Sequence, residues 1–143
     1  MNLEPVFVDT WGWMALGHRR QPRHVKVQEF YRKLREQQTR IYTSDYILDE
    51  LITLLFRRES FTESVRFVDG LFAAIAQGHL LMERVTWERF ATAWELRKQF
   101  QDKPGISFTD LTSMAIIRDL RISQVLTEDE HFIQAGMGFF RVP

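Results

Sequence analysis

Short apolar runs alternate along this chain with longer stretches in which apolar residues recur every three or four positions. Runs of the first kind predict buried strands, and stretches of the second kind predict amphipathic helices. Strands that alternate with helices are typical of α/β proteins with a parallel sheet. Because 143 residues is the size of one ordinary domain, we expect a single α/β domain over residues 1–143.

The pattern predicts five strands and five principal helices. The strands are expected at residues 6–8, 40–43, 80–84, 123–126 and 139–142. The helices are expected at residues 24–38, 45–57, 61–77, 87–99 and 108–120, the last four after the N-caps Ser44, Ser60, Thr86 and Ser107. Ser60 with Glu63 is also a capping-box pattern. A short helical turn is expected over residues 132–135, ended by Gly136.

Composition narrows the class of protein. Apolar residues make up 45% of the chain and charged residues 27%, with a net charge of zero, which argues against a disordered chain. The absence of cysteine excludes disulfides, thiolate catalysis and thiolate metal sites. Neither a secretory signal nor an apolar run of membrane-spanning length is evident, so we expect a cytoplasmic protein.

Four acids occupy positions that an α/β fold can bring together. Asp9 directly follows the first strand, and Asp129 lies three residues after the fourth. Asp110 lies in the first turn of the helix that leads to the fourth strand, and Glu50 lies in the helix after the second. Ligands of parallel sheets bind at the carboxyl ends of the strands, so we expect these four acids to form one site.

A cluster of four carboxylates is chemically reasonable only around a cation. Without one, the carboxylates repel each other and raise each other's pKa values. Hard oxygen ligands favour Mg²⁺ or Mn²⁺, and no competing zinc motif is present. Such an ion can activate a water molecule and stabilise charge on a phosphodiester. Such a site is suited to the hydrolysis of a phosphodiester.

Each acid taken alone has a simpler explanation. Asp110 with Ser107 is a capping-box pattern, and Asp9 can cap a helix or a turn. Glu50 fits a solvated helix face, and Asp129 fits a solvated acidic loop. The joint arrangement, rather than any one acid, indicates the site.

The order of these motifs resembles a known family. Its parts are Asp9 after a strand, Glu50 on a helix, Ser107-Phe108-Thr109-Asp110 opening a helix, and Thr127-Glu128-Asp129-Glu130-His131-Phe132 followed by Gly136. Over residues 7–142 the chain resembles the PIN-domain ribonucleases, and within them the VapC-like toxins of toxin–antitoxin pairs.

The resemblance implies a three-layer domain with a five-stranded parallel sheet, and Mg²⁺ or Mn²⁺ held by Asp9, Glu50, Asp110 and Asp129. It implies endonucleolytic cleavage of RNA by a metal-bound water, with Thr127 as a supporting hydroxyl. It also implies a homodimer and a cognate antitoxin whose tail covers the acidic cleft. One departure is Trp11, which occupies a position where the family commonly has a small serine.

Two further features leave alternatives open. The basic stretch with Arg19, Arg20 and Arg23 is either a phosphate-contacting loop that steers RNA or a solvated loop. The aromatic residues Phe30, Phe67, Phe72 and Phe90 recur at helical spacings and are expected in the core rather than as base-stacking surfaces.

Three alternative functions are compatible with parts of this pattern. A phosphoacceptor receiver domain is disfavoured, because it requires a lone Asp after the third strand and a Lys after the fifth, and neither is present. A stand-alone RNA-processing nuclease could carry the same site. A catalytically silent binding module keeps the fold without the chemistry, although all four acids are present.

Overall fold

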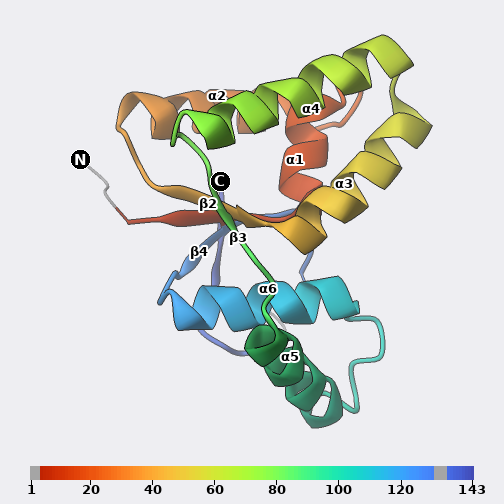
Figure 1. Ribbon diagram of the computed structural model, residues 1–143, viewed down its shortest axis with the longest axis vertical. Coiled ribbons are helices and arrows are strands. Elements are labelled where there is room, and N and C mark those ends of the chain that lie inside the picture. The colour runs from red at the N-terminus through yellow and green to blue at the C-terminus, as the bar shows by residue number, and fades with distance from the viewer. Residues whose placement is uncertain (1–3, 131–134) are drawn as a thin grey trace.

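The computed structural model describes residues 4–130 and 135–143 (Figure 1). Its centre is a five-stranded sheet in the order β3-β2-β1-β4-β5, in which all neighbours are parallel. The strands are β1 (Val6–Val8), β2 (Ile41–Ser44), β3 (Leu81–Glu83), β4 (Gln124–Leu126) and β5 (Phe140–Val142). The five-stranded parallel sheet expected from the sequence is confirmed. The expected helical turn at 132–135 lies outside the described residues except for Ala135.

Six helices cover the two faces of this sheet within the described residues. On one face lie α1 (Thr10–Gly17), α2 (His24–Glu36), α3 (Asp45–Arg58) and α4 (Phe61–Ala76). On the other face lie α5 (Trp87–Gln99) and α6 (Phe108–Asp119), as Figure 1 shows. The domain therefore has three layers. None of the helices in the described ranges is long and apolar enough to span a membrane.

The helices begin where their predicted N-caps stand. The hydroxyls of Ser44, Ser60, Thr86 and Ser107 each accept a hydrogen bond from the backbone N–H three residues on. At Ser60 the predicted capping box is only half formed, because the Ser60 N–H donates to Glu59 instead of Glu63. Local hydrogen bonds therefore decide the residue at which each of these four helices begins.

One helix, α1, was not predicted from the sequence. Its eight residues carry almost no amphipathic pattern, because both Trp13 and the small residues around it are buried. A helix that is enclosed on most sides lacks the polar stripe on which prediction depends. A second expectation was wrong for Phe72, whose side chain is 49% exposed on α4.

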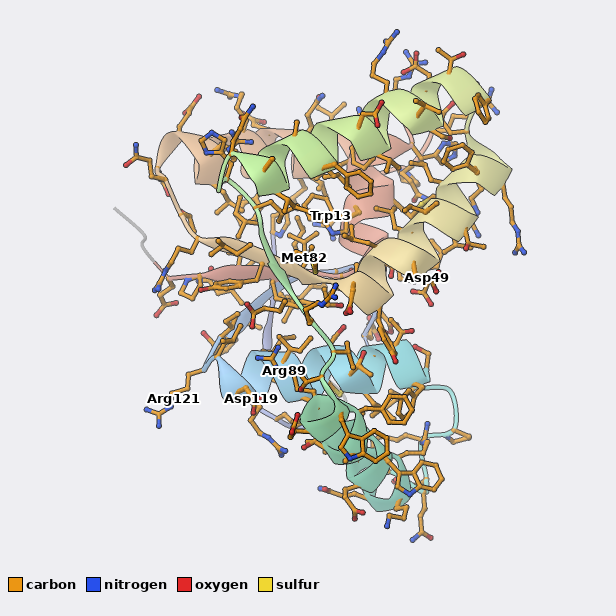
Figure 2. The ribbon with its side chains drawn as sticks, in the orientation of Figure 1. Trp13, Asp49, Met82, Arg89, Asp119 and Arg121 are labelled. Atoms are coloured by element: carbon orange, nitrogen blue, oxygen red, sulfur yellow. The ribbon has the colours of Figure 1, made fainter. Side chains whose placement is uncertain are left out.

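A buried hydrogen-bonded chain holds β1, α1 and β2 together. The indole Nε1–H of Trp13 donates to Thr43 Oγ1 (3.0 Å), and the Thr43 hydroxyl donates to the Val8 carbonyl (3.1 Å). Trp13, labelled in Figure 2, and Val8 are fully buried in the apolar core, and Thr43 is fully buried beside them. Because Val8 immediately precedes Asp9, this chain fixes the end of β1, from which the first acid projects.

We expect Thr43→Val to destabilise the protein by about 1–3 kcal/mol, because it leaves the Trp13 N–H and the Val8 carbonyl without a partner in the core. Urea unfolding followed by tryptophan fluorescence measures this change. Thr43→Ser retains the hydroxyl and is the matched control. Equal stability of the valine variant and the wild type would contradict the role assigned to this hydrogen-bonded chain.

Candidate active site

The strand order reverses between β1 and β4, at the centre of the sheet. From β1 the chain builds outward through β2 to β3, then crosses back to β4 on the other side of β1. In open parallel sheets, such a switch point is where ligands bind at the carboxyl ends of the strands. Asp9 follows β1 at this edge, and Thr127 and Asp129 follow β4.

Asp9 is held in place at both carboxylate oxygens. Its Oδ1 accepts a hydrogen bond from the Gly12 N–H (2.9 Å), so it caps α1, and its Oδ2 accepts the hydroxyl proton of Thr127. Its own N–H donates to the Leu126 carbonyl (3.2 Å). Asp9 is 2% exposed, so its carboxyl group is almost fully removed from water. Asp9 therefore caps α1, as one of the simpler explanations predicted. The same hydrogen bond also orients its carboxyl group.

Thr127 connects two of the candidate acids. Its hydroxyl donates to Asp9 and accepts the backbone N–H of Asp129 (2.8 Å). One buried side chain thus fixes both the Asp9 carboxylate and the start of the segment that carries Asp129.

Asp110 lies in the first turn of α6 and forms a complete capping box with Ser107. The Asp110 N–H donates to Ser107 Oγ (3.0 Å), and the Ser107 N–H donates to Asp110 Oδ2 (3.2 Å). The capping-box explanation is therefore also correct. It holds the Asp110 carboxyl, which is 8% exposed, at the start of α6.

The electrostatics of the site show that the distant acids influence one another. The pKa of Asp9 is raised from 3.8 to about 8, chiefly because the carboxyl is buried; the charges of Asp110 and Asp129 also raise it, and its hydrogen bonds from Thr127 and Gly12 lower it. Burial and the charge of Asp129 raise the pKa of Asp110 to about 6, with a smaller contribution from Glu50. Four acids from separate parts of the chain therefore share one electrostatic environment.

The donor chemistry of this site suits a hard divalent cation. All four acids offer carboxylate oxygens, and the buried hydroxyl of Thr10, next to Asp9, has no hydrogen-bond partner among the described residues. No three of these acids, or of any described His, Asp or Glu, lie close enough to form a ready-made ligand set. Repulsion between like charges favours such separation, and a cation would remove that repulsion.

We expect the metal-free protein to lose stability as the pH rises. The pKa of Asp9 is about 8 when folded, against 3.8 as its ordinary value, so the folded chain binds more protons between these pH values. The stability that the folded protein gains by keeping Asp9 protonated is fully present below pH 3.8. It is lost as the pH rises through 8. Thermal unfolding in EDTA from pH 5 to 8.5 measures the decline.

Asp9→Asn is the control for this pH dependence. The amide keeps the shape of the side chain and its acceptor for the Gly12 N–H but does not ionise. At pH 8.5 the variant should be more stable than the wild type by at least about 1 kcal/mol, the equivalent of one pKa unit. If wild type and variant have parallel stability profiles, Asp9 is not the group that titrates.

In the basic stretch between α1 and α2, one arginine forms contacts within the protein and two are exposed to solvent. Arg23 forms an ion pair with Glu128 (2.9 Å) and donates to the Pro143 carbonyl (2.9 Å), so it joins this stretch to the segment that carries Asp129. Arg19 and Arg20 are exposed. Whether these arginines contact RNA stays a prediction.

Trp11 lies on α1, two residues after Asp9. Its half-buried ring lies against the core, and the Arg58 guanidinium stands 5.2 Å from the ring centroid. Sequence reasoning also missed Gly12 and Thr43, which position Asp9. A glycine or threonine in a helical or strand pattern carries no signal of this role, because the partner lies elsewhere in the chain.

The fold and this site define the class of protein. The chain belongs to the PIN-domain family, whose sequence profile matches residues 6–137. Among characterised proteins, it is 30% identical over 131 residues to the 23S rRNA-specific endonuclease VapC20 of Mycobacterium tuberculosis, covering 92% of this chain and 94% of VapC20.

Solved structures agree with this assignment. The crystal structure of M. tuberculosis VapC20, described as a sarcin-ricin loop cleaving toxin, matches with a TM-score of 0.79 and 31% identity, covering 96% of this chain and 98% of that one. VapBC2 of Rickettsia felis, solved with a DNA fragment from its promoter, matches with a TM-score of 0.71. At 14% identity over 96% of this chain and 97% of that one, the second match supports the fold alone.

Proposed function

We propose that this protein is an endoribonuclease that depends on Mg²⁺ or Mn²⁺ and acts as the toxin of a toxin–antitoxin pair. The observation that carries the proposal is the shared electrostatic environment of Asp9, Asp110 and Asp129 at the switch point of the sheet. Similarity to VapC20, whose name describes a 23S rRNA endonuclease, supports RNA as the substrate.

Each residue has a defined task in this proposal. Asp9, Asp110 and Asp129 hold the metal ion, and Glu50 completes the set directly or through a water. When bound, the ion supplies a water of lowered pKa and stabilises negative charge on the phosphodiester. Glu50 orients the attacking water or accepts its proton. Thr127 holds Asp9 and Asp129 in register through its two hydrogen bonds.

The proposal includes partners and a location. A cognate antitoxin covers the acidic cleft, a second copy forms a homodimer, and the protein acts in the cytoplasm. The toxin role is supported by the similarity to VapC20, a protein described as a toxin. A small overlapping upstream gene would support the antitoxin pairing, and a stand-alone RNA-processing nuclease is the alternative if no such gene exists.

Metal binding and RNA cleavage test the proposal together. Mn²⁺ binding by calorimetry should be clear for the wild type and weakened by Asp9→Asn and by Glu50→Gln. The wild type should cut a fluorogenic RNA in Mn²⁺ and lose this activity in EDTA. Absence of Mn²⁺ binding, or equal binding by both variants, would instead favour a catalytically silent binding module.

A further inference from the structure

Arg23 bridges the ends of two neighbouring strands. Its Nη1 forms an ion pair with Glu128 Oε1 (2.9 Å), and its Nη2 donates to the Pro143 carbonyl (2.9 Å). Glu128 lies two residues after β4, and Pro143 directly follows β5. Because β4 and β5 are parallel neighbours, both ends lie at the same edge of the sheet. One guanidinium therefore joins two segments at the edge where Asp9 follows β1.

The local structure around Arg23 gains nothing from an arginine. Arg23 is the N-cap residue of α2, and its side chain forms no capping hydrogen bond. A guanidinium has donors but no acceptor, so it cannot bind the free N–H groups of the first helical turn. Its positive charge also stands at the positive end of the helix dipole, where a cation is unfavourable. The favourable contacts of this side chain are therefore the tertiary ones, with Glu128 and Pro143.

The ion pair between Arg23 and Glu128 is shielded from solvent. Its two side chains are 22% and 30% exposed, whereas those of the Arg32–Glu36 pair on α2 are 61% and 60% exposed. Solvent screening leaves exposed pairs with little net effect on structure. The shielded pair is supported by a second hydrogen bond from the same guanidinium, so it restrains Glu128 more firmly than Arg32 restrains Glu36.

The backbone from which Arg23 extends is itself anchored to α1. The next residue, His24, donates from its ring Nδ1 to the Ala15 carbonyl of α1 (2.7 Å). Asp9 caps the other end of the same helix through the Gly12 N–H. The contact with Glu128 therefore connects the segment after β4 to the helix that begins at the first candidate acid.

Asp129 is preceded by two residues whose side chains are both bound. Thr127 donates to Asp9 and accepts the Asp129 N–H (2.8 Å). Glu128 is bound by Arg23. A loop residue that is restrained before its ligand arrives loses less conformational entropy when the ligand binds. Restraint of Glu128 thus favours one placement of Asp129 before any ion is present.

We propose that Arg23 is a positioning residue, which acts through Glu128 to hold Asp129 ready to bind the metal ion. The inference rests on the proposed function and deepens it, because it gives Arg23 a task other than contact with RNA. The Glu128 carboxylate offsets the positive charge of Arg23, so this guanidinium attracts phosphate less than those of the exposed Arg19 and Arg20.

Calorimetric titration with Mn²⁺, without RNA, tests the inference. Arg23→Met and Glu128→Ala should each weaken Mn²⁺ binding about tenfold, at the lower end for groups that orient metal ligands. The double variant should bind no more weakly than either single variant, because both changes remove the same ion pair. Arg23→Lys keeps a charge opposite Glu128 and should recover part of the loss. Arg32→Met breaks the exposed pair with Glu36 and is the matched control, with unchanged Mn²⁺ affinity.

Hydrogen exchange gives a readout that needs neither metal nor RNA. In EDTA, the Asp129 amide should exchange about fivefold faster in Arg23→Met and in Glu128→Ala than in the wild type, the factor expected for loss of one partly shielded ion pair. The melting temperature should change by less than about 5 °C, because an ion pair at the edge of the domain contributes little to global stability. A purely structural role would instead lower the melting temperature and leave the Mn²⁺ affinity of the folded protein unchanged.

Kinetics separate this role of Arg23 from direct contact with RNA. A phosphate contact would raise KM in Arg23→Met and reduce the slope of log KM against log salt by about one, with Mn²⁺ binding and Asp129 exchange unchanged. That result would overturn the inference, as would additive losses of Mn²⁺ affinity in the double variant. In both cases the wild type still binds Mn²⁺, and the proposed function stands. A wild type that binds no Mn²⁺ overturns the proposed function and this inference together.

Discussion

Asp129→Asn should lower the rate of RNA cleavage by about a thousandfold, because it removes a proposed ligand of the metal ion that would stabilise charge in the transition state, and losing one such stabilising interaction costs about 10²–10³-fold. The amide keeps the size of the side chain but removes the negative charge that acts on both Asp9 and Asp110. Single-turnover cleavage of the fluorogenic RNA, at saturating Mn²⁺, measures the effect.

Thr127 offers a graded comparison at the same site. Thr127→Val removes the hydroxyl that links Asp9 to the Asp129 N–H, and we expect a loss of about 10–100-fold, as for other residues that orient metal ligands. Thr127→Ser keeps the hydroxyl and should remain close to the wild type. Full activity of the valine variant would mean that Thr127 supports the fold but not the chemistry.

Gly12→Ala should be the most destabilising single-methyl addition in α1. A Cβ at this position would stand 2.5 Å from the Leu126 carbonyl oxygen and 2.9 Å from a Val8 methyl, so β4 or α1 must move. We expect a loss of about 3 kcal/mol, at the upper end for overpacking. The Gly12 N–H also holds Asp9, so cleavage should fall together with stability.

Gly70→Ala is the matched control for this prediction. Gly70 lies within α4, and a Cβ there would meet nothing within 4 Å. In an open helical position the same change should raise stability by about 0.5–1 kcal/mol. Thermal and urea unfolding of both variants measure the contrast. Similar changes in the two variants would show that the close approach of α1 to β4 is not the cause.

Much of the fold could be predicted because its signals are local. Ser44 and Ser107 each begin a helix by bonding a backbone N–H three residues away, and the short apolar runs become strands because they are too short and too apolar for helices. The parallel arrangement followed from the alternation of strands with helices. Helix α1 could not be predicted, because its environment comes from elements distant in sequence.

The candidate acids were predictable for a different reason. Asp9 and Asp129 follow strands, and parallel strands end at one edge, so the sequence order alone indicates that they meet. The sequence pattern could not separate a capping role from a functional one for Asp9 or Asp110. The structure shows that capping and orientation occur together, since the hydrogen bonds that begin α1 and α6 also fix the Asp9 and Asp110 carboxyls.

The sequence by itself determined the class of fold and most helix boundaries, because both depend on periodicity and short-range hydrogen bonds, and it predicted the four candidate acids from their places relative to the strands. Only the tertiary structure decided that Thr127 links Asp9 to Asp129, that Gly12 lets α1 approach β4, and that burial raises the pKa of Asp9 to about 8. Only it brought the Phe90 ring into contact with both Trp87 and Phe108. The physical reason is that these contacts join residues whose proximity exists only once the layers have packed.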